Sequence, residues 1–309
     1  MRTPRRVAAL LTTAPLAALL AVAAPSPAAA APDYERLCPG PAAELKAVQA
    51  RIRAHNARPN VSTSASYVAS YNAEAATLRT EQNRAISRLM ACERALDRAQ
   101  AKHPRTQFMT PSANVVQKIE RTLKNVSTEE KNAVQRWNAK TYEFPRYGKD
   151  RHGNDKKGMT KRVDMRPPKL PPSVHSLYKV IDDNRPDFPP TTYLRGVQAP
   201  KIGSPDNAYP ASRNLRVTGV AMDHIVPLRR LVALPGFLEL TPHNMYVVAH
   251  SPVNAQWLSK KSNGSKGSGS AALTGGTTTA WRQEQARIRQ EAEEDLKELI
   301  QDLLKSQGK

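Results

Sequence analysis

The chain is poor in aromatic side chains and in cysteine, and only its first residues form a long apolar run. Aromatic residues make up 5% of its 309 residues, and it contains two cysteines and 25 prolines. Beyond residue 31 no apolar run approaches the roughly 18 residues that a membrane-spanning helix needs. With so few large apolar side chains, we expect two folded parts joined by poorly structured chain rather than one compact core.

The first 31 residues have the pattern of a secretory signal peptide. Arginines at positions 2, 5 and 6 precede an Ala/Leu run, and the segment ends in small residues. A charged start, a short apolar centre and a small-residue end are typical of a signal that is removed on export. We therefore expect a secreted, extracellular protein.

Basic residues outnumber acidic ones strongly. The net charge is +20, and without residues 1–31 the Lys and Arg count falls from 47 to 44 against 27 acids, which leaves +17. An exported chain of this charge is expected to meet polyanions, namely nucleic acid, anionic wall polymer or a membrane surface. Charge alone does not choose among them.

Residues 32–102 have the pattern of a helical, coiled-coil-like hairpin. Apolar residues recur at helical spacing in two stretches, separated by a break at residues 56–64. Cys38 and Cys92 lie at places where such a hairpin brings them level. An even pair of cysteines in an exported protein predicts one disulfide bond between them.

The remaining chain divides by composition into three parts. Residues 103–143 are predicted to be a helical connector, with a helix at 113–123 and a second one starting at the capping box Ser127–Glu130. Residues 144–200 are basic and proline-rich, and we expect them to be partly extended. Residues 201–309 contain the strongest strand pattern and end in a charged helix from Ala280 to about Lys305.

The most informative pattern is Asp223-His224-Ile225-Val226-Pro227, which ends an apolar run. Asn244 then opens a second β-prone run at residues 245–249. Ser251-Pro252 is a helix-start signal, which places Asn254 in the first turn of a following helix. The sequence thus predicts strand, loop, strand and helix with Asp-His, Asn and Asn at the turning points.

This arrangement resembles the HNH branch of the ββα-metal endonucleases over residues 220–266. The resemblance implies an α+β, mostly helical protein, with an N-terminal helical hairpin and a C-terminal ββα-metal nuclease core with flanking helices at 201–309. It implies that His224 is the general base, that Asn244 holds the loop between the strands, and that Asp223 and Asn254 bind one divalent metal ion. A site with only two protein oxygen ligands leaves most coordination positions to water and phosphate. Such a site suits Mg²⁺, or Mn²⁺ as a near substitute. Neither cysteine is near the motif, so the zinc knuckle of some relatives is absent.

Several assignments stay open. Asn263 is the alternative to Asn254, because Asn263-Gly264-Ser265-Lys266 resembles the end of many HNH motifs. His243 and His250 are further candidates for a role at the site. The expected phosphate contacts are basic residues near the motif: Arg229, Arg230, Lys260, Lys261 and Lys266.

The sequence therefore predicts a secreted HNH endonuclease that cuts phosphodiester bonds of DNA, with RNA as an open alternative. No element for reading bases is evident, which predicts low sequence specificity. A scavenging nuclease and a toxin with an inhibitor protein as partner are both compatible with it. The rival prediction is a secreted, non-catalytic binder of nucleic acid or anionic polymer with a degenerate HNH-like fold.

Overall fold

The structure is a computed structural model that describes residues 5–6, 33–59, 61–62, 64–103, 107–138, 170–266 and 274–309. The chain forms two compact units. Unit 1 comprises residues 1–95 and 305–309, and unit 2 comprises residues 96–304. The described chain is mostly helical with a small antiparallel sheet in unit 2, as the predicted α+β class requires.

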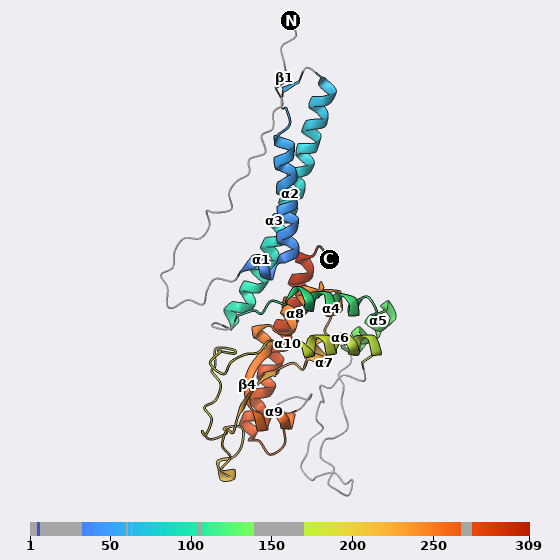
Figure 1. Ribbon diagram of the computed structural model, residues 1–309. Coiled ribbons are helices and arrows are strands. Elements are labelled where there is room, and N and C mark those ends of the chain that lie inside the picture. The colour runs from blue at the N-terminus through green and yellow to red at the C-terminus, as the bar shows by residue number, and fades with distance from the viewer. Residues whose placement is uncertain are drawn as a thin grey trace, which may run out of the picture. The chain divides into compact units, whose positions relative to one another are not determined.

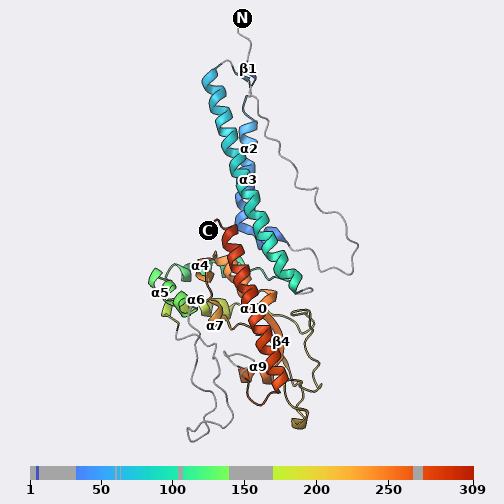
Figure 2. The ribbon, with the colours of Figure 1, turned by 180° about the vertical axis from the view of Figure 1, so that it is seen from behind.

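Unit 1 is built on the predicted helical hairpin. The short helix α1 (Tyr34–Leu37) leads into α2 (Pro39–Asn56), and α3 (Ala65–Lys102) begins after the predicted break. The two long helices run side by side in both ribbon views (Figures 1 and 2). Apolar side chains of both helices form their shared core: Val48, Ile52, Ala75 and Leu78.

Cys38 and Cys92 form the predicted disulfide bond. Their Cα atoms are 6.2 Å apart, and both residues are buried. Cys38 lies directly before α2 instead of several extended residues away from it, because α1 ends at Leu37. The bond closes a loop of 54 residues in sequence. A loop of this size stabilises the fold by about 4 kcal/mol on the chain-entropy model.

The predicted signal peptide lies almost wholly outside the described residues. Its described part is the two-residue strand β1 (Arg5–Arg6), which pairs with β2 (Val61–Ser62) in the hairpin loop.

Unit 2 opens with helices that follow their sequence signals. Helix α4 (Ala113–Leu123) has the predicted bounds, and α5 (Thr128–Asn138) begins at the capping box. The amide N–H of Ser127 donates to Oε2 of Glu130 over 3.1 Å, and the N–H of Glu130 donates to Oγ of Ser127 over 3.2 Å. These reciprocal bonds satisfy amide groups that the first helical turn leaves without partners.

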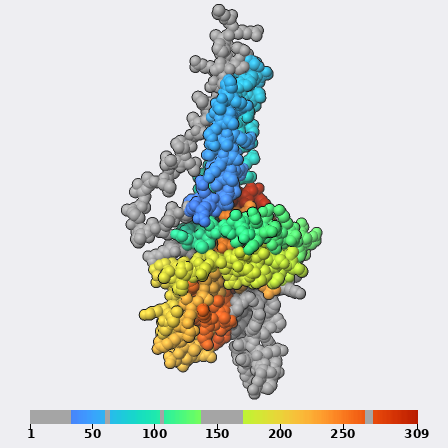
Figure 3. Space-filling model, in the orientation of Figure 1, coloured from blue at the N-terminus to red at the C-terminus, as the bar shows by residue number. Residues whose placement is uncertain are grey.

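The partly extended region predicted at 144–200 contains a helix. Residues 139–169, which include most of the basic residues of this region, lie outside the described residues. Helix α6 (Pro172–Asp183) follows them, buries Val174, Leu177 and Ile181, and packs on α4. Figure 3 shows the two helices as adjoining green and yellow-green bands. The sequence analysis placed no helix in this segment, although Pro172 is at the first position of α6, where its missing N–H costs nothing.

The sheet of unit 2 is an antiparallel pair of strands. Strand β3 (Val220–His224) pairs with β4 (Ala255–Ser259), with Asp223 opposite Gln256 and His224 opposite Ala255. The first strand ends at the Asp-His pair, as predicted. Helix α9 (Lys260–Lys266) follows β4 directly, so the order β3, β4, α9 places a helix immediately after the hairpin.

The second predicted strand, at residues 245–249, is wrong. These residues belong to α8 (Pro242–Ala249), in which Thr241 caps the first turn and accepts a hydrogen bond from the N–H of Asn244 over 3.4 Å. All residues from Asn244 to Ala249 are buried. A helix buried on every side gives the same unbroken apolar run as a buried strand, and the sequence pattern does not distinguish them.

The predicted helix around Asn254 is also wrong. Pro252–Asn254 forms a single 3-10 turn, and the chain then enters β4. The connection between the strands also contains α7 (Leu228–Leu231) and a 3-10 turn at Phe237–Glu239. Helix α10 (Thr279–Ser306) agrees with the predicted C-terminal helix, and in both ribbon views it runs beside β4 (Figures 1 and 2).

Within the described ranges, no helix has both the length and the apolar character that crossing a bilayer requires.

Candidate functional site

Asp223 and His224 lie at the end of β3, where the chain turns. The turn is held by Asn254, whose Oδ1 accepts the N–H of Val226 over 2.8 Å and whose Nδ2 donates to the Val226 carbonyl over 3.1 Å. The backbone N–H of Ile225 also donates to the carbonyl of Asn254. Neighbouring strand residues face opposite sides, so a turn fixed at this point lets both side chains approach one pocket.

This geometry corrects the roles given to two asparagines. Asn254 is fully buried and uses its amide to hold the chain between the strands, which is the role predicted for Asn244. Its oxygen already accepts an N–H, so it does not suit the metal-ligand role predicted for it. Asn244 is buried in the first turn of α8 and does not line the pocket beside His224.

Asp223 is buried and bound on both carboxylate oxygens. Nε2 of Gln256, its partner across the sheet, donates to Oδ2 over 2.9 Å. Nζ of Lys266 forms an ion pair with Oδ1 and also donates to the carbonyl of His224 over 2.6 Å. A carboxylate oxygen and a carbonyl oxygen therefore meet at one positive charge, which is itself nearly excluded from solvent.

A pocket of about 280 Å³ opens beside these groups. One wall is formed by Asp223 and His224 of β3 with Asn263 and Lys266 of α9. The pocket thus includes Asn263, the alternative to Asn254, at a half-buried position. Asp223, His224 and Asn263 thus line one pocket, whereas Asn254, the predicted residue on the helix, does not line it.

Three further lining residues come from α6 and from Arg185 just after it, and the sequence analysis selected none of them. These are Tyr178, Asp182 and Arg185. Arg185 is paired with Asp182, and the Tyr178 hydroxyl donates to Asp182 over 3.4 Å. Burial raises the pKa of Tyr178 above its ordinary value, so its hydroxyl keeps its proton at neutral pH. The helical spacing of Leu177 and Ile181 was the available signal for this wall.

His224 is in contact with a second histidine. Its Nε2 lies 3.3 Å from Nδ1 of His250, and the ring centroids are 5.4 Å apart. Burial lowers the pKa of His224 well below its ordinary range, and His250, Arg185 and Lys266 lower it further. Burial also lowers the pKa of His250, to about 3. Both imidazoles are therefore neutral at neutral pH, the form in which a ring nitrogen accepts a proton.

The five predicted phosphate contacts divide into two groups. Arg229 and Lys266 line the pocket. Arg230 instead makes two hydrogen bonds to Glu293 of α10, at 2.9 and 3.2 Å, which hold it as a structural ion pair. Lys260 packs over Gly219, and the ammonium of Lys261 lies 5.8 Å from the centre of the Tyr209 ring. Of the five, two are placed to meet a ligand in the pocket.

The described residues contain no cluster of three or more His, Cys, Asp or Glu side chains suited to hold a metal ion. Lys266 binds one carboxylate oxygen, from Asp223, and one backbone carbonyl, from His224, and Asn263 lines the same pocket. His243, at the start of α8, is not among the residues that line the pocket.

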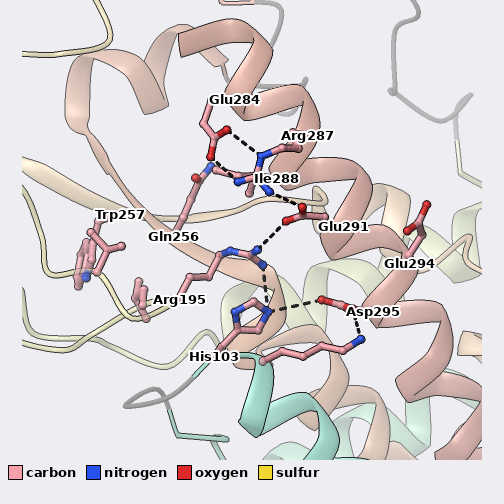
Figure 4. A pocket seen from close by; sticks show the side chains of 13 residues that line it. His103, Arg195, Gln256, Trp257, Glu284, Arg287, Ile288, Glu291, Glu294 and Asp295 are labelled. Atoms are coloured by element: carbon pink, nitrogen blue, oxygen red, sulfur yellow. Dashed lines mark hydrogen bonds and ion pairs between the residues drawn. The ribbon is translucent and has the colours of Figure 1, made fainter. Parts of the chain in front are cut away.

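A second, larger pocket of about 630 Å³ lies against α10 and β4. Figure 4 shows Arg195 reaching between His103, 3.2 Å from its Nη1, and Glu291, 3.5 Å from its Nη2. Arg287 pairs with Glu284 on the same wall. Gln256 links the two pockets, since it lines this one and binds Asp223 of the other. Basic and acidic side chains pair across this pocket, among them His103, whose Nε2 lies 3.5 Å from a carboxylate oxygen of Asp295.

Comparison of the chain with models of protein families, with curated proteins and with solved structures gives no match.

Proposed function

We propose that the protein is a secreted, metal-dependent HNH-type endonuclease that hydrolyses phosphodiester bonds of DNA, with RNA as the alternative substrate. The observation that carries the proposal is the arrangement β3, β4, α9. It brings Asp223, His224 and Asn263 to one pocket, while Asn254 fixes the turn between the strands. The roles follow the order that the resemblance implies, but with other asparagines. Asn254 takes the loop-holding role predicted for Asn244, and Asn263 takes the metal-ligand role predicted for Asn254.

In the proposed reaction His224 is the general base. A water molecule attacks phosphorus, the O–P bond forms, and the proton of the water passes to a neutral ring nitrogen of His224. The P–O3′ bond breaks, its electron pair goes to O3′, and O3′ takes a proton from solvent, which leaves a 5′-phosphate. Arg185 and Arg229 line the same pocket and would hold the phosphate oxygens.

The residues present fit a divalent ion at the position of the Lys266 ammonium. That ammonium is a stand-in cation, since a carboxylate oxygen of Asp223 and the carbonyl of His224 both bind it. Asp223 and Asn263 would hold Mg²⁺, or Mn²⁺ in its place, through hard oxygen ligands with water filling other positions. The bound ion would supply neutralisation of charge on the phosphate and on the leaving oxygen. Lys266 would then turn from Asp223 toward the phosphate.

The proposal includes export of the protein and nucleic acid as its partner. The signal-like first 31 residues and the disulfide bond of unit 1 favour an extracellular protein. The net charge of +17 beyond residue 31 suits a polyanionic partner, of which the proposed chemistry selects nucleic acid, and an inhibitor protein is expected if the nuclease is a toxin. Unit 1 would be a separate module for delivery or docking.

Incubation of the purified protein with supercoiled plasmid and with single-stranded RNA, each with Mg²⁺ or with chelator, tests the proposal. We expect nicking that needs the metal and is lost in Asp223→Ala, while His243→Ala keeps full activity as a matched control outside the pocket. If the protein binds DNA but does not cleave it with any metal, the nuclease proposal is wrong and the protein is the non-catalytic binder. Cleavage that persists in chelator would contradict the metal-dependent chemistry.

A further inference from the structure

The histidine pair at the end of β3 contains one ring that the proposed reaction does not use. His250 ends α8 and is 2% exposed, so it touches neither solvent nor a substrate in the pocket. Its Nδ1 nevertheless lies 3.3 Å from Nε2 of His224. A buried polar side chain in contact with a general base acts on catalysis through that base.

The contact between the two ring nitrogens has only two arrangements when both rings are neutral. Either Nε2 of His224 carries the proton and donates it to Nδ1 of His250, or Nδ1 of His250 carries the proton and donates it to Nε2 of His224. In the first arrangement Nδ1 of His224 has a free electron pair. In the second arrangement His224 carries its own proton on Nδ1, and the base has no electron pair to offer the pocket.

The proposed role of His224 as a base selects the first arrangement. A base needs a ring nitrogen with a free electron pair, and Nε2 of His224 is the nitrogen that faces His250. Nδ1 is then the free nitrogen of a neutral His224, so its proton is on Nε2 and is donated to a bare Nδ1 of His250. The proton of His250 is then on its Nε2, which is buried and makes no direct hydrogen bond within the described residues.

The ring of His250 is held in this orientation by packing. The edge of the Tyr246 ring meets it with centroids 4.5 Å apart. The backbone N–H of His250 donates to the carbonyl of Tyr246 one turn earlier, which fixes the residue to the end of α8. A fixed acceptor is what keeps the tautomer and the ring direction of a neighbouring histidine constant.

We infer that His250 is a positioning residue that accepts the Nε2 proton of His224, so that Nδ1 of His224 is the atom that takes the proton from water. This inference rests on the proposed function, because it names the atom and the support of the proposed base. The geometry assigns the role to His250, whose Nδ1 lies 3.3 Å from Nε2 of His224, and His243 on α8 does not line the pocket.

Nitrogen-15 NMR of the purified protein labelled in its histidines tests the tautomer without any cleavage. Signals are assigned from His224→Ala and His250→Phe. We expect both His224 and His250 to carry the proton on Nε2 and to have an unprotonated Nδ1 at neutral pH. A proton on Nδ1 of His224 in the unmodified protein overturns the inference.

Two substitutions at His250 test the positioning role in the reaction. His250→Phe keeps the ring volume but removes the acceptor, and we expect the cleavage rate to fall by about 10- to 100-fold. His250→Asn places a side-chain oxygen near the position of Nδ1, and we expect it to recover most of the rate and the Nε2–H tautomer of His224. His243→Phe serves as the control, with no loss expected.

The failures of the two proposals are distinguishable. If the protein cleaves no nucleic acid but shows the expected tautomers, the proposed function fails and the hydrogen-bond assignment stands. If the protein cleaves and His250→Phe, folded by its thermal unfolding curve, keeps both the full rate and the tautomer of His224, the positioning role is wrong. A rate loss in His250→Phe that His250→Asn does not recover assigns His250 to packing alone.

Discussion

Asn254 and Asn263 show how two like residues, nine positions apart, have different tasks. The amide of Asn254 is enclosed and makes both of its hydrogen bonds to Val226, whereas Asn263 faces the pocket at a half-buried position. The first is needed for the shape of the turn, and the second is available to a ligand. Substitution of Asn254 should therefore change the stability of the fold, and substitution of Asn263 should change the metal dependence of cleavage.

Asn254→Ala is expected to destabilise the fold, because it leaves the buried N–H and carbonyl of Val226 without partners. An unsatisfied buried group costs about 1–3 kcal/mol. Asn263→Ala should change the free energy of unfolding by less than about 0.5 kcal/mol and raise the Mg²⁺ concentration needed for cleavage. Urea unfolding and a Mg²⁺ titration of cleavage measure the two effects. A normal Mg²⁺ requirement in Asn263→Ala would reject it as the ligand.

The buried histidines predict that stability falls as the pH is lowered. The unfolded chain protonates His250 near its ordinary pKa of about 6.5, whereas the folded chain does so only near pH 3. Between these values the unfolded state binds more protons, so the free energy of unfolding rises with pH and is lost as the pH falls. His224 acts in the same direction.

Urea unfolding of the protein and of His250→Phe, from about pH 7 to about pH 4.5, checks this linkage. The unmodified protein should lose more stability over this range than the variant, because the phenyl ring takes up no proton in either state. Equal losses would mean that His250 titrates normally in the folded protein.

At the scale of elements, the sequence patterns predicted correctly those helices that have one apolar face and one face toward solvent. The hairpin α2–α3 and the capped helix α5 have one apolar stripe or a clear start signal, and both were predicted. Helix α8 is buried all round, so residues 245–249 gave no period and were predicted as a strand. Because of this error the second strand was predicted ten residues too early, and the loop-holding role was assigned to Asn244 instead of Asn254.

The position of Lys266 on α9 predicts a competition between its ammonium and a divalent ion. Lys266→Met keeps the length of the side chain but leaves the buried carboxylate of Asp223 without a positive partner, which is strongly destabilising in a buried ion pair. Mn²⁺ should restore this partner. We therefore expect a lower melting temperature without metal and a larger upward shift with Mn²⁺ than in the unmodified protein.

Thermal unfolding with and without Mn²⁺ measures the effect, and Lys261→Met, on the exposed side of the same helix, is the matched control. If Mn²⁺ stabilises Lys266→Met less than it stabilises the unmodified protein, the oxygens around Lys266 are not the cation site.

At the scale of the whole molecule, sequence and structure agree best where a covalent constraint is strong. The two cysteines predicted a bond that the structure contains, whereas the polyanionic partner indicated by the basic charge stays a prediction. The wall of the pocket formed by α6 was not predicted, because a contact between residues near 180 and near 224 depends on packing between elements distant in sequence. Spacing within one segment carries no information about such a contact.

Removal of the disulfide bond should weaken unit 1. We expect the double variant Cys38→Ser with Cys92→Ser to lose about 4 kcal/mol of stability, because its unfolded chain is no longer closed into a loop. Urea unfolding measures the loss, with the reduced unmodified protein as the control. Alkylation of the unreduced protein followed by mass spectrometry should label neither cysteine, and two labelled thiols would mean that the bond does not form in solution.

The most direct test of the nuclease account is the cleavage rate of DNA by His224→Ala in the presence of Mg²⁺. Removal of a general base is expected to lower the rate by about 10²- to 10⁴-fold, while binding of the same DNA in Ca²⁺, which supports binding without fast cleavage, stays close to that of the unmodified protein. A rate equal to that of the unmodified protein would contradict the account, because the chemistry would then lie outside the pocket formed by β3, α6 and α9.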